Sequence, residues 1–159
     1  MTKKAALLAL GLLFISCAQK PEVVYVERKN IPGQENTNPP SIKISLQEAA
    51  VLEKAHLLIR KGEVREAIAV LEDSIIENRS KPFRCLAFSL LNVAYLKKGK
   101  ISSFLAYGRE LVENCRAFRR LPETTQVLCL LYSTWSNDSI PEDLSIKPEI
   151  REQITSLIK

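Results

Sequence analysis

Four cysteines are the side chains of this sequence best suited to covalent chemistry, because a thiol can be acylated, paired in a disulfide or bound to a metal. Cys17 follows an apolar run, whereas Cys85, Cys115 and Cys129 lie much further along the chain. The three later cysteines lack the paired short spacings of zinc sites, and His56 is the sole histidine that could join them. We therefore expect neither a bound metal nor another cofactor.

The residues around Cys17 indicate that this cysteine carries lipid. Lys3 and Lys4 precede eleven mostly apolar residues, 5–15, a run shorter than the roughly 20 residues that span a bilayer. A positive start, an apolar run and a small residue before the cut are typical of a secretory signal. Phe14-Ile15-Ser16-Cys17 resembles the bacterial lipobox, with Phe in place of the usual Leu. The resemblance implies removal of residues 1–16 as a signal peptide and diacylation of the Cys17 thiol by fatty acids such as palmitate. An ordinary cleaved signal with an incidental cysteine is the alternative.

The three remaining cysteines would enter an exported compartment, where disulfides can form. Cys85 opens one predicted helix and Cys115 closes the next, so an antiparallel hairpin would bring these two thiols close together. A Cys85–Cys115 disulfide and two buried free thiols remain alternatives. Cys129 stands in the apolar run 127–131, where we expect a small core residue.

No group of residues in the sequence forms a recognisable catalytic set. His56 has no partner at a catalytic spacing and lies between Ala55 and Leu57, which favours a half-buried packing role. The five glycines form no Gly-rich loop before a helix, so a phosphate-binding loop is not expected. Glu123 and Glu142-Asp143 stand near predicted helix starts, where capping explains them. The sequence thus predicts a protein that is not an enzyme.

The charge pattern does not favour nucleic acid as a partner. The formal net charge of +5 includes Lys3 and Lys4 of the signal, and acidic and basic residues alternate through most of the remaining chain. Two basic groups stand out: Lys97, Lys98 and Lys100, and Arg116, Arg119 and Arg120. Each falls at a predicted helix end, where positive side chains complement the helix dipole, and each is also suited to anionic lipid, cell-wall polymer or an acidic partner.

Composition divides the mature chain into a linker and a domain. Residues 17–44 are predicted to form the lipidated N-terminus and a disordered, flexible tether, because prolines, Asn and Gln interrupt any periodicity. Residues 45–159 are predicted to form one all-α domain with six helices, of which Ser45-Leu46-Gln47-Glu48 starts the first through a capping box. The expected helices are 45–61, 63–77, 80–97, 101–114, 122–135 and a last one from 148. Leu46 and Ile76 are expected on buried faces.

Three of the predicted helices share a 37-residue register. Its columns are Leu58, Tyr95 and Tyr132; Gly62, Gly99 and Ser136; and the mostly small Ala55, Asn92 and Cys129. A helical hairpin can bury its apolar side only against a neighbour, so pairs at this interval predict antiparallel hairpins stacked as a short solenoid.

Residues 48–78 resemble the tetratricopeptide repeat (TPR). The matching positions are Ala55, Leu58, Gly62, Ala67, Leu71 and Ser74. The register departs from the family period of about 34 residues, Val51 replaces the usual Trp, and the second unit has Phe104 where a small residue is preferred. The resemblance implies a TPR-like solenoid, and an irregular helical bundle is the alternative.

Aromatic and basic residues suggest an interaction surface. Tyr107 and Trp135 could line a groove between hairpins, because aromatic residues are enriched at interfaces, while Tyr95 and Tyr132 are expected in the core. We take as candidate surface residues Tyr107, Trp135, Lys97, Lys98 and Lys100.

A lipid-anchored stack of helices predicts an adaptor or scaffold that binds another envelope protein. At the level of fold it resembles pilotins, which escort secretin subunits to the outer membrane, and this implies a part in assembling a secretion or pilus complex. Ala18 after the acylated cysteine is what the common sorting rule associates with the outer membrane, so we expect the domain to face the periplasm. The alternative is a lipoprotein that binds a small ligand or lipid in a cavity between the third, fourth and fifth helices.

Overall fold

The structure, a computed structural model, describes residues 42–158, and all regular structure in that range is α-helical. The helices are α2 (Leu46–Lys61), α3 (Val64–Glu77), α4 (Lys81–Lys97), α5 (Ile101–Cys115), α6 (Glu123–Ser136) and α7 (Pro148–Ile158). The prediction of an all-α domain is confirmed, with helix ends close to those expected. The predicted signal peptide, Cys17 and the tether as far as residue 41 lie outside the described residues.

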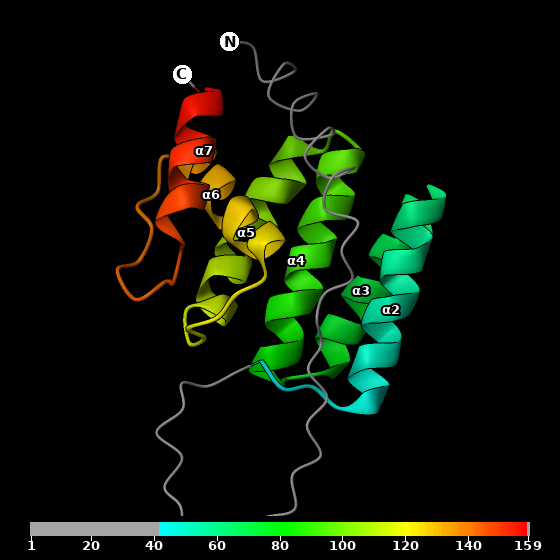
Figure 1. The fold of residues 1–159 in the computed structure, drawn as a ribbon. Coiled ribbons are helices and arrows are strands. Elements are labelled where there is room, and N and C mark those ends of the chain that lie inside the picture. The colour runs from blue at the N-terminus through cyan, green and yellow to red at the C-terminus, as the bar shows by residue number, and fades with distance from the viewer. Residues whose placement is uncertain (1–41, 159) are drawn as a thin grey trace, which may run out of the picture.

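The helices stack in a row, with α2 and α3 at one end and α6 and α7 at the other (Figure 1). Each helix packs against the next one in the chain, and α4 also packs against both α2 and α6. The helices α2, α4 and α6 are therefore neighbours, as the first helices of successive hairpins are in a solenoid. This arrangement confirms the predicted stack of hairpins. None of the helices from α2 to α7 is both long and apolar enough to cross a membrane.

The capping box predicted for α2 is present. Ser45 Oγ accepts a hydrogen bond from the Glu48 backbone N–H at 3.2 Å, and the Glu48 carboxylate accepts one from the Ser45 N–H at 2.7 Å. The second oxygen of Glu48 accepts a bond from Asn78 Nδ2 at 2.8 Å. The start of α2 is therefore tied to the residue that follows α3.

Residues with left-handed backbone conformation end α2, α4 and α6. They are Gly62 (φ 84°), Gly99 (φ 67°) and Asn137 (φ 62°). In the first two turns a backbone N–H donates to the carbonyl oxygen five residues earlier. The Glu63 N–H donates to Leu58 O, and the Lys100 N–H donates to Tyr95 O, so Leu58 and Tyr95 accept equivalent bonds. The third turn departs from the register by one residue, because Ser136 still belongs to α6 and Asn137 adopts the left-handed conformation. The repeat is thus visible in the backbone conformation, and in the last unit it is shifted by one residue.

The core lies between the helices and contains the small residues of the register. Ala55, Asn92 and Cys129 are each 0% exposed, which allows the neighbouring helices to approach at these points. The large buried side chains around them include Phe83, Phe88, Phe104, Leu111 and Leu128. Ile42 and Ile44 also pack against this core, so contact with the domain begins before the first helix.

Two residues expected on buried faces are exposed. Leu46 is 76% exposed and Ile76 is 71% exposed, so both predictions were wrong. Leu46 begins α2 at the end of the stack, where no earlier hairpin covers it, and Ile76 lies in the last turn of α3. Helical periodicity alone does not show how far a neighbouring helix extends.

The close approach of α5 and α6 depends on Gly108, which the sequence analysis did not single out. A Cβ atom built on Gly108 would lie 2.3 Å from Cδ2 of Tyr132, a distance that real side chains do not adopt. Phe104, one turn earlier on α5, is 0% exposed. The second unit therefore places its small residue one turn later than the TPR resemblance implies.

The cysteines of α4 and α5 are joined. Cys85 Sγ and Cys115 Sγ form a disulfide with an S–S distance of 2.10 Å, and both residues are buried. The bond links the start of α4 to the end of α5. Cys129 is free and buried, and burial raises the pKa of its thiol to about 12.

We predict that Gly108→Ala destabilises the domain by about 1–3 kcal/mol, because the new methyl group must displace the Tyr132 ring. Urea unfolding would measure the change. In a Tyr132→Ala background the same substitution is expected to be neutral or stabilising, since Ala favours a helix over Gly by about 1 kcal/mol. Equal destabilisation in both backgrounds would show that the Tyr132 contact is not the cause.

We predict that reduction of the Cys85–Cys115 bond costs about 3–4 kcal/mol, because the bond closes a loop with a sequence separation of 30. The measurement is urea unfolding with and without a phosphine reductant in a Cys17→Ser background. Cys129→Ala is the matched control and should leave the effect of the reductant unchanged. An unfolding midpoint that does not move on complete reduction, verified by mass, would contradict the prediction.

Candidate interaction surface

Tyr107, one of the predicted surface residues, makes its main contacts within the fold. It lies on α5 and is half-buried. Its ring stacks on Tyr95 of α4 with centroids 5.5 Å apart and an interplanar angle of 10°, and its hydroxyl donates to Glu72 Oε1 at 3.1 Å. Burial and the hydrogen bond to Glu72 raise the pKa of Tyr107. Tyr107 therefore fastens α5 to α3 and α4, and only part of its ring is available to a partner.

Trp135 is also half-buried, but on a different helix pair. Its indole ring meets Phe104 of α5 edge to face, with centroids 5.5 Å apart and an interplanar angle of 75°. The two aromatic residues thus belong to separate internal contacts, Tyr107 with α4 and Trp135 with α5. They do not form an aromatic pair in the described residues.

The three predicted lysines have different neighbours. Lys97 lies close enough to His56 of α2 for its charge to act on the histidine. Lys98 lies instead near Arg65 and Glu66 of α3, and it shares this neighbourhood with Lys100. Lys97 therefore lies near α2 and Lys98 near α3, although the two are adjacent in sequence.

Two basic side chains, Arg60 of α2 and Lys97 of α4, form a cluster around His56. Partial burial is the largest cause that lowers the pKa of His56, and the positive charges of Arg60 and Lys97 lower it further. Arg60 and Lys97 are exposed, and neither is in an ion pair within the part of the chain that the structure describes. Arg60 is not among the predicted surface residues. The sequence nevertheless carries a signal for it, since Arg60 and Lys97 are 37 residues apart and share one position of the register.

The same register positions continue onto α6. His56 corresponds to Val93 and Leu130, and Arg60 corresponds to Lys97 and Thr134. Because α4 packs against both α2 and α6, these positions lie side by side along the row. Val93 and Leu130 are buried, at 7% and 6% exposed, so the exposed part consists of His56, Arg60, Lys97 and Thr134, which we call the α2–α4–α6 face. It is positive at its α2 end.

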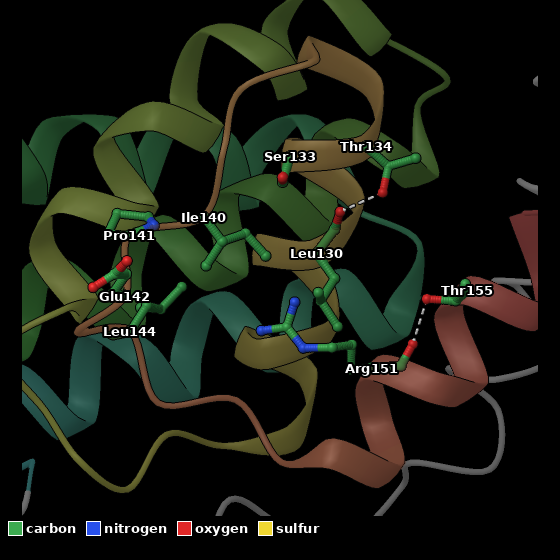
Figure 2. Close-up of a pocket in the computed structure, with 9 residues that line it drawn as sticks. All are labelled: Leu130, Ser133, Thr134, Ile140, Pro141, Glu142, Leu144, Arg151 and Thr155. Atoms are coloured by element: carbon green, nitrogen blue, oxygen red, sulfur yellow. Dashed lines mark hydrogen bonds between the residues drawn. The ribbon is translucent and has the colours of Figure 1, made fainter.

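A pocket of about 420 Å³ lies at the α6 end of this face, between α6, the segment 137–147 and α7 (Figure 2). It is lined by Leu130, Ser133, Thr134, Ile140, Pro141, Glu142, Leu144, Arg151 and Thr155. Thr134 Oγ1 donates to Leu130 O and Thr155 Oγ1 donates to Arg151 O, each at 2.8 Å, so these hydroxyl protons are already bonded. The guanidinium of Arg151 and the carboxylate of Glu142 place both signs of charge on the wall. The pocket therefore suits a small polar group.

This pocket differs from the cavity that the ligand-binding alternative expects between α4, α5 and α6. The inner faces of those helices carry Phe88, Phe104 and Leu128, which are 2%, 0% and 0% exposed. Large side chains thus fill the space between them. Sequence spacing gave no sign of the observed pocket, because it depends on how α7 and segment 137–147 return to α6.

Side-chain contacts fix the segment that forms the pocket. Gln126, which is 2% exposed, donates to Leu121 O at 2.8 Å and accepts from the Lys147 N–H at 2.8 Å. Arg116 pairs with Asp143 at 2.9 Å, and Lys147 pairs with Glu123 at 3.1 Å. The ion pairs are exposed and contribute about 0–1 kcal/mol each, so the buried amide is the stronger restraint.

We predict that His56 titrates below its ordinary pKa and that Lys97→Ala raises this pKa, because removing a nearby positive charge favours the protonated imidazole. The chain has one histidine, so a proton NMR titration reports on it directly. Arg60→Ala should act in the same direction. Lys100→Ala is the control, since Lys100 is not among the charges that act on His56, and a shift as large as that of Lys97→Ala would contradict the cluster.

The positive cluster and the pocket are the candidate binding features of the described residues. No group of three His, Cys, Asp or Glu side chains between residues 42 and 158 is placed to hold a metal ion. The surface offers positive charge on α2 and α4, and a pocket beside α6 whose wall carries both Arg151 and Glu142. Comparisons with protein-family models, with curated proteins and with solved structures found no match for this chain.

Proposed function

We propose that this chain is a lipid-anchored adaptor of the bacterial cell envelope, which holds another envelope protein at the membrane during assembly of a secretion or pilus complex. One observation carries the proposal. On the α2–α4–α6 face, His56, Arg60 and Lys97 gather where α2 meets α4, without an acidic partner from the described residues. Such a face suits an acidic segment of another protein, because complementary charge guides and orients association.

The sequence supports the anchoring half of the proposal. Cys17 ends a short signal-like run, and its acylation would attach the mature chain to a lipid leaflet. Residues 18–41, which the sequence predicts to form a flexible tether, separate this cysteine from the first described residue, and a flexible coil of this length would span about 25–30 Å on average. A partner bound by the domain would then stay within a few nanometres of the membrane.

The sorting rule that favours the outer membrane, through Ala18, would place the domain in the periplasm. That compartment permits the Cys85–Cys115 disulfide, which holds α4 against α5. The bond lies at the start of α4, whereas Lys97 is the last residue of that helix, so the bond supports the fold of the domain and not the position of Lys97 itself.

The ligand-binding alternative is favoured by a separate observation, the pocket beside α6 (Figure 2). Its wall is mainly polar and carries both the guanidinium of Arg151 and the carboxylate of Glu142, which suits a small polar molecule that can pair with both charges. Such binding needs neither Cys17 nor the pair of Arg60 and Lys97. The two functions are therefore separable by substitution.

We predict that Cys17→Ala leaves the domain folded but removes its envelope complex from the membrane fraction, because the anchor is lost. Crosslinking followed by purification from membranes would measure this. The double variant Arg60→Glu/Lys97→Glu should retain the anchor and weaken the complex by about tenfold or more, since the face becomes acidic. Arg119→Glu/Arg120→Glu, which changes two exposed arginines between α5 and α6, is the matched control.

An unchanged complex in Cys17→Ala would refute the anchoring half of the proposal. An unchanged complex in Arg60→Glu/Lys97→Glu would refute the binding face. Loss of a bound small molecule in Arg151→Gln, with the protein complex intact, would favour the ligand-binding alternative.

A further inference from the structure

The outer side of α2 carries exposed apolar residues at positions that are buried one unit later. Leu46, Ala50 and Leu57 correspond through the 37-residue register to Phe83, Ala87 and Ala94 of α4. The α4 residues are 1%, 0% and 0% exposed, whereas Leu46 is 76% exposed, Leu57 is 49% exposed and Ala50 is also exposed. The same positions therefore have opposite environments in two neighbouring units.

The difference follows from the place of α2 in the stack. The helix α4 packs against both α2 and α3, so the preceding hairpin covers one side of it. The helix α2 lies at the end of the row, with no earlier hairpin among the described residues (Figure 1). We call the uncovered residues Leu46, Ala50 and Leu57 the end face.

The end face has the shape of a helix-packing surface. Its residues are separated by four and seven positions, which places them in one stripe along α2. Ala50 is the small residue in the middle of the stripe, as Ala87 is in α4, and a small residue allows a neighbouring helix to come close. The occupant that fits is thus a helix, because a helical hairpin already covers the corresponding side of α4.

The charged residues along the stripe indicate which charges that occupant would carry. Lys54 stands where α4 has Leu91, which is 0% exposed, so an occupant would come close to this lysine. Lys61 corresponds to Lys98, which has Glu66 of α3 among its charged neighbours together with Arg65. Glu53 lies within the stripe, three residues after Ala50 and four before Leu57, whereas Lys54 and Lys61 lie along one edge of it, so the occupant would meet one acidic group inside the stripe and two lysines at its edge. An occupant with acidic residues opposite Lys54 and Lys61 would complement them.

We infer that the end face docks an amphipathic helix of the partner protein, apolar along one side and acidic along its edge, which extends the stack by one helix. The inference rests on the proposed adaptor function and specifies where part of the partner lies. The end face and the positive α2–α4–α6 face then bind two segments of one partner, and the second segment adds affinity because it is already held nearby. A second copy of this chain fits less well, because it would bring the same two lysines to the interface.

The experiment places the photoreactive residue benzoylphenylalanine at Ala50 in the full lipoprotein, irradiates native membranes and maps the crosslinked positions by mass spectrometry. The expected result is crosslinking to one segment of an envelope protein at positions three or four residues apart, as one side of a helix requires. Leu46→Gln/Leu57→Gln in the same chain should lower the yield by about tenfold, and Lys54→Glu should lower it too. The unfolding midpoint should not change, because both leucines are exposed.

Ile76→Gln is the matched control. Ile76 is 71% exposed, and its register counterpart Glu113 is exposed as well, so this position is not covered when units stack. The control should leave the crosslinking yield unchanged. A loss equal to that of the leucine variant would show a general effect of surface polarity and would overturn the inference.

Four other outcomes would also overturn it: crosslinks to a second copy of this chain, to its own residues 18–41 or to lipid alone, and a yield that the leucine variant does not change. The proposed function is tested separately by the complex that depends on Cys17. If that complex persists in Leu46→Gln/Leu57→Gln and position 50 gives no helical crosslinks, the end-face inference fails and the adaptor function stands. If helical crosslinks persist in Cys17→Ala, anchoring fails and the end face stands.

Discussion

The structure depends on the burial of each helical hairpin against the next. A hairpin such as α2–α3 has apolar residues on more than one side and can cover only one of them by itself. The register places small side chains, Ala55, Asn92 and Cys129, where the helices meet, and all three are completely buried. Gly108 does the same for α5 and α6, where its missing side chain makes room for the Tyr132 ring. The fold is therefore a chain of nearest-neighbour contacts.

Nearest-neighbour stacking also determines what happens at the two ends of the row. At the α6 end, segment 137–147 and α7 fold back onto α6, held by the buried amide of Gln126. This return leaves the pocket whose wall includes Arg151 (Figure 2). At the α2 end nothing in the described chain returns, and Leu46 and Leu57 stay exposed. The two ends are covered differently, and for this reason the pocket lies at the α6 end and the exposed leucines lie at the α2 end.

The same periodicity that builds the core also arranges the charges. Arg60 and Lys97 occupy one register position on adjacent helices, so stacking brings their positive charges together beside His56. Two like charges at the same position oppose each other slightly when the chain folds. An acidic partner would relieve that repulsion, which is the physical basis of the proposed adaptor. The Cys85–Cys115 bond holds the start of α4 against the end of α5, far along α4 from Lys97.

The sequence by itself determined the local features of the fold. Capping by Ser45 and the left-handed turns at Gly62 and Gly99 depend on hydrogen bonds and backbone preferences within a few residues, and the sequence shows them directly. The tertiary structure alone decided the exposure of Leu46 and Ile76, the contact of Gly108 with Tyr132, the separation of Lys97 from Lys98, and the pocket beside α7. These features depend on residues that lie far apart in the chain, and helical periodicity does not specify which neighbour a helix meets or where that contact ends.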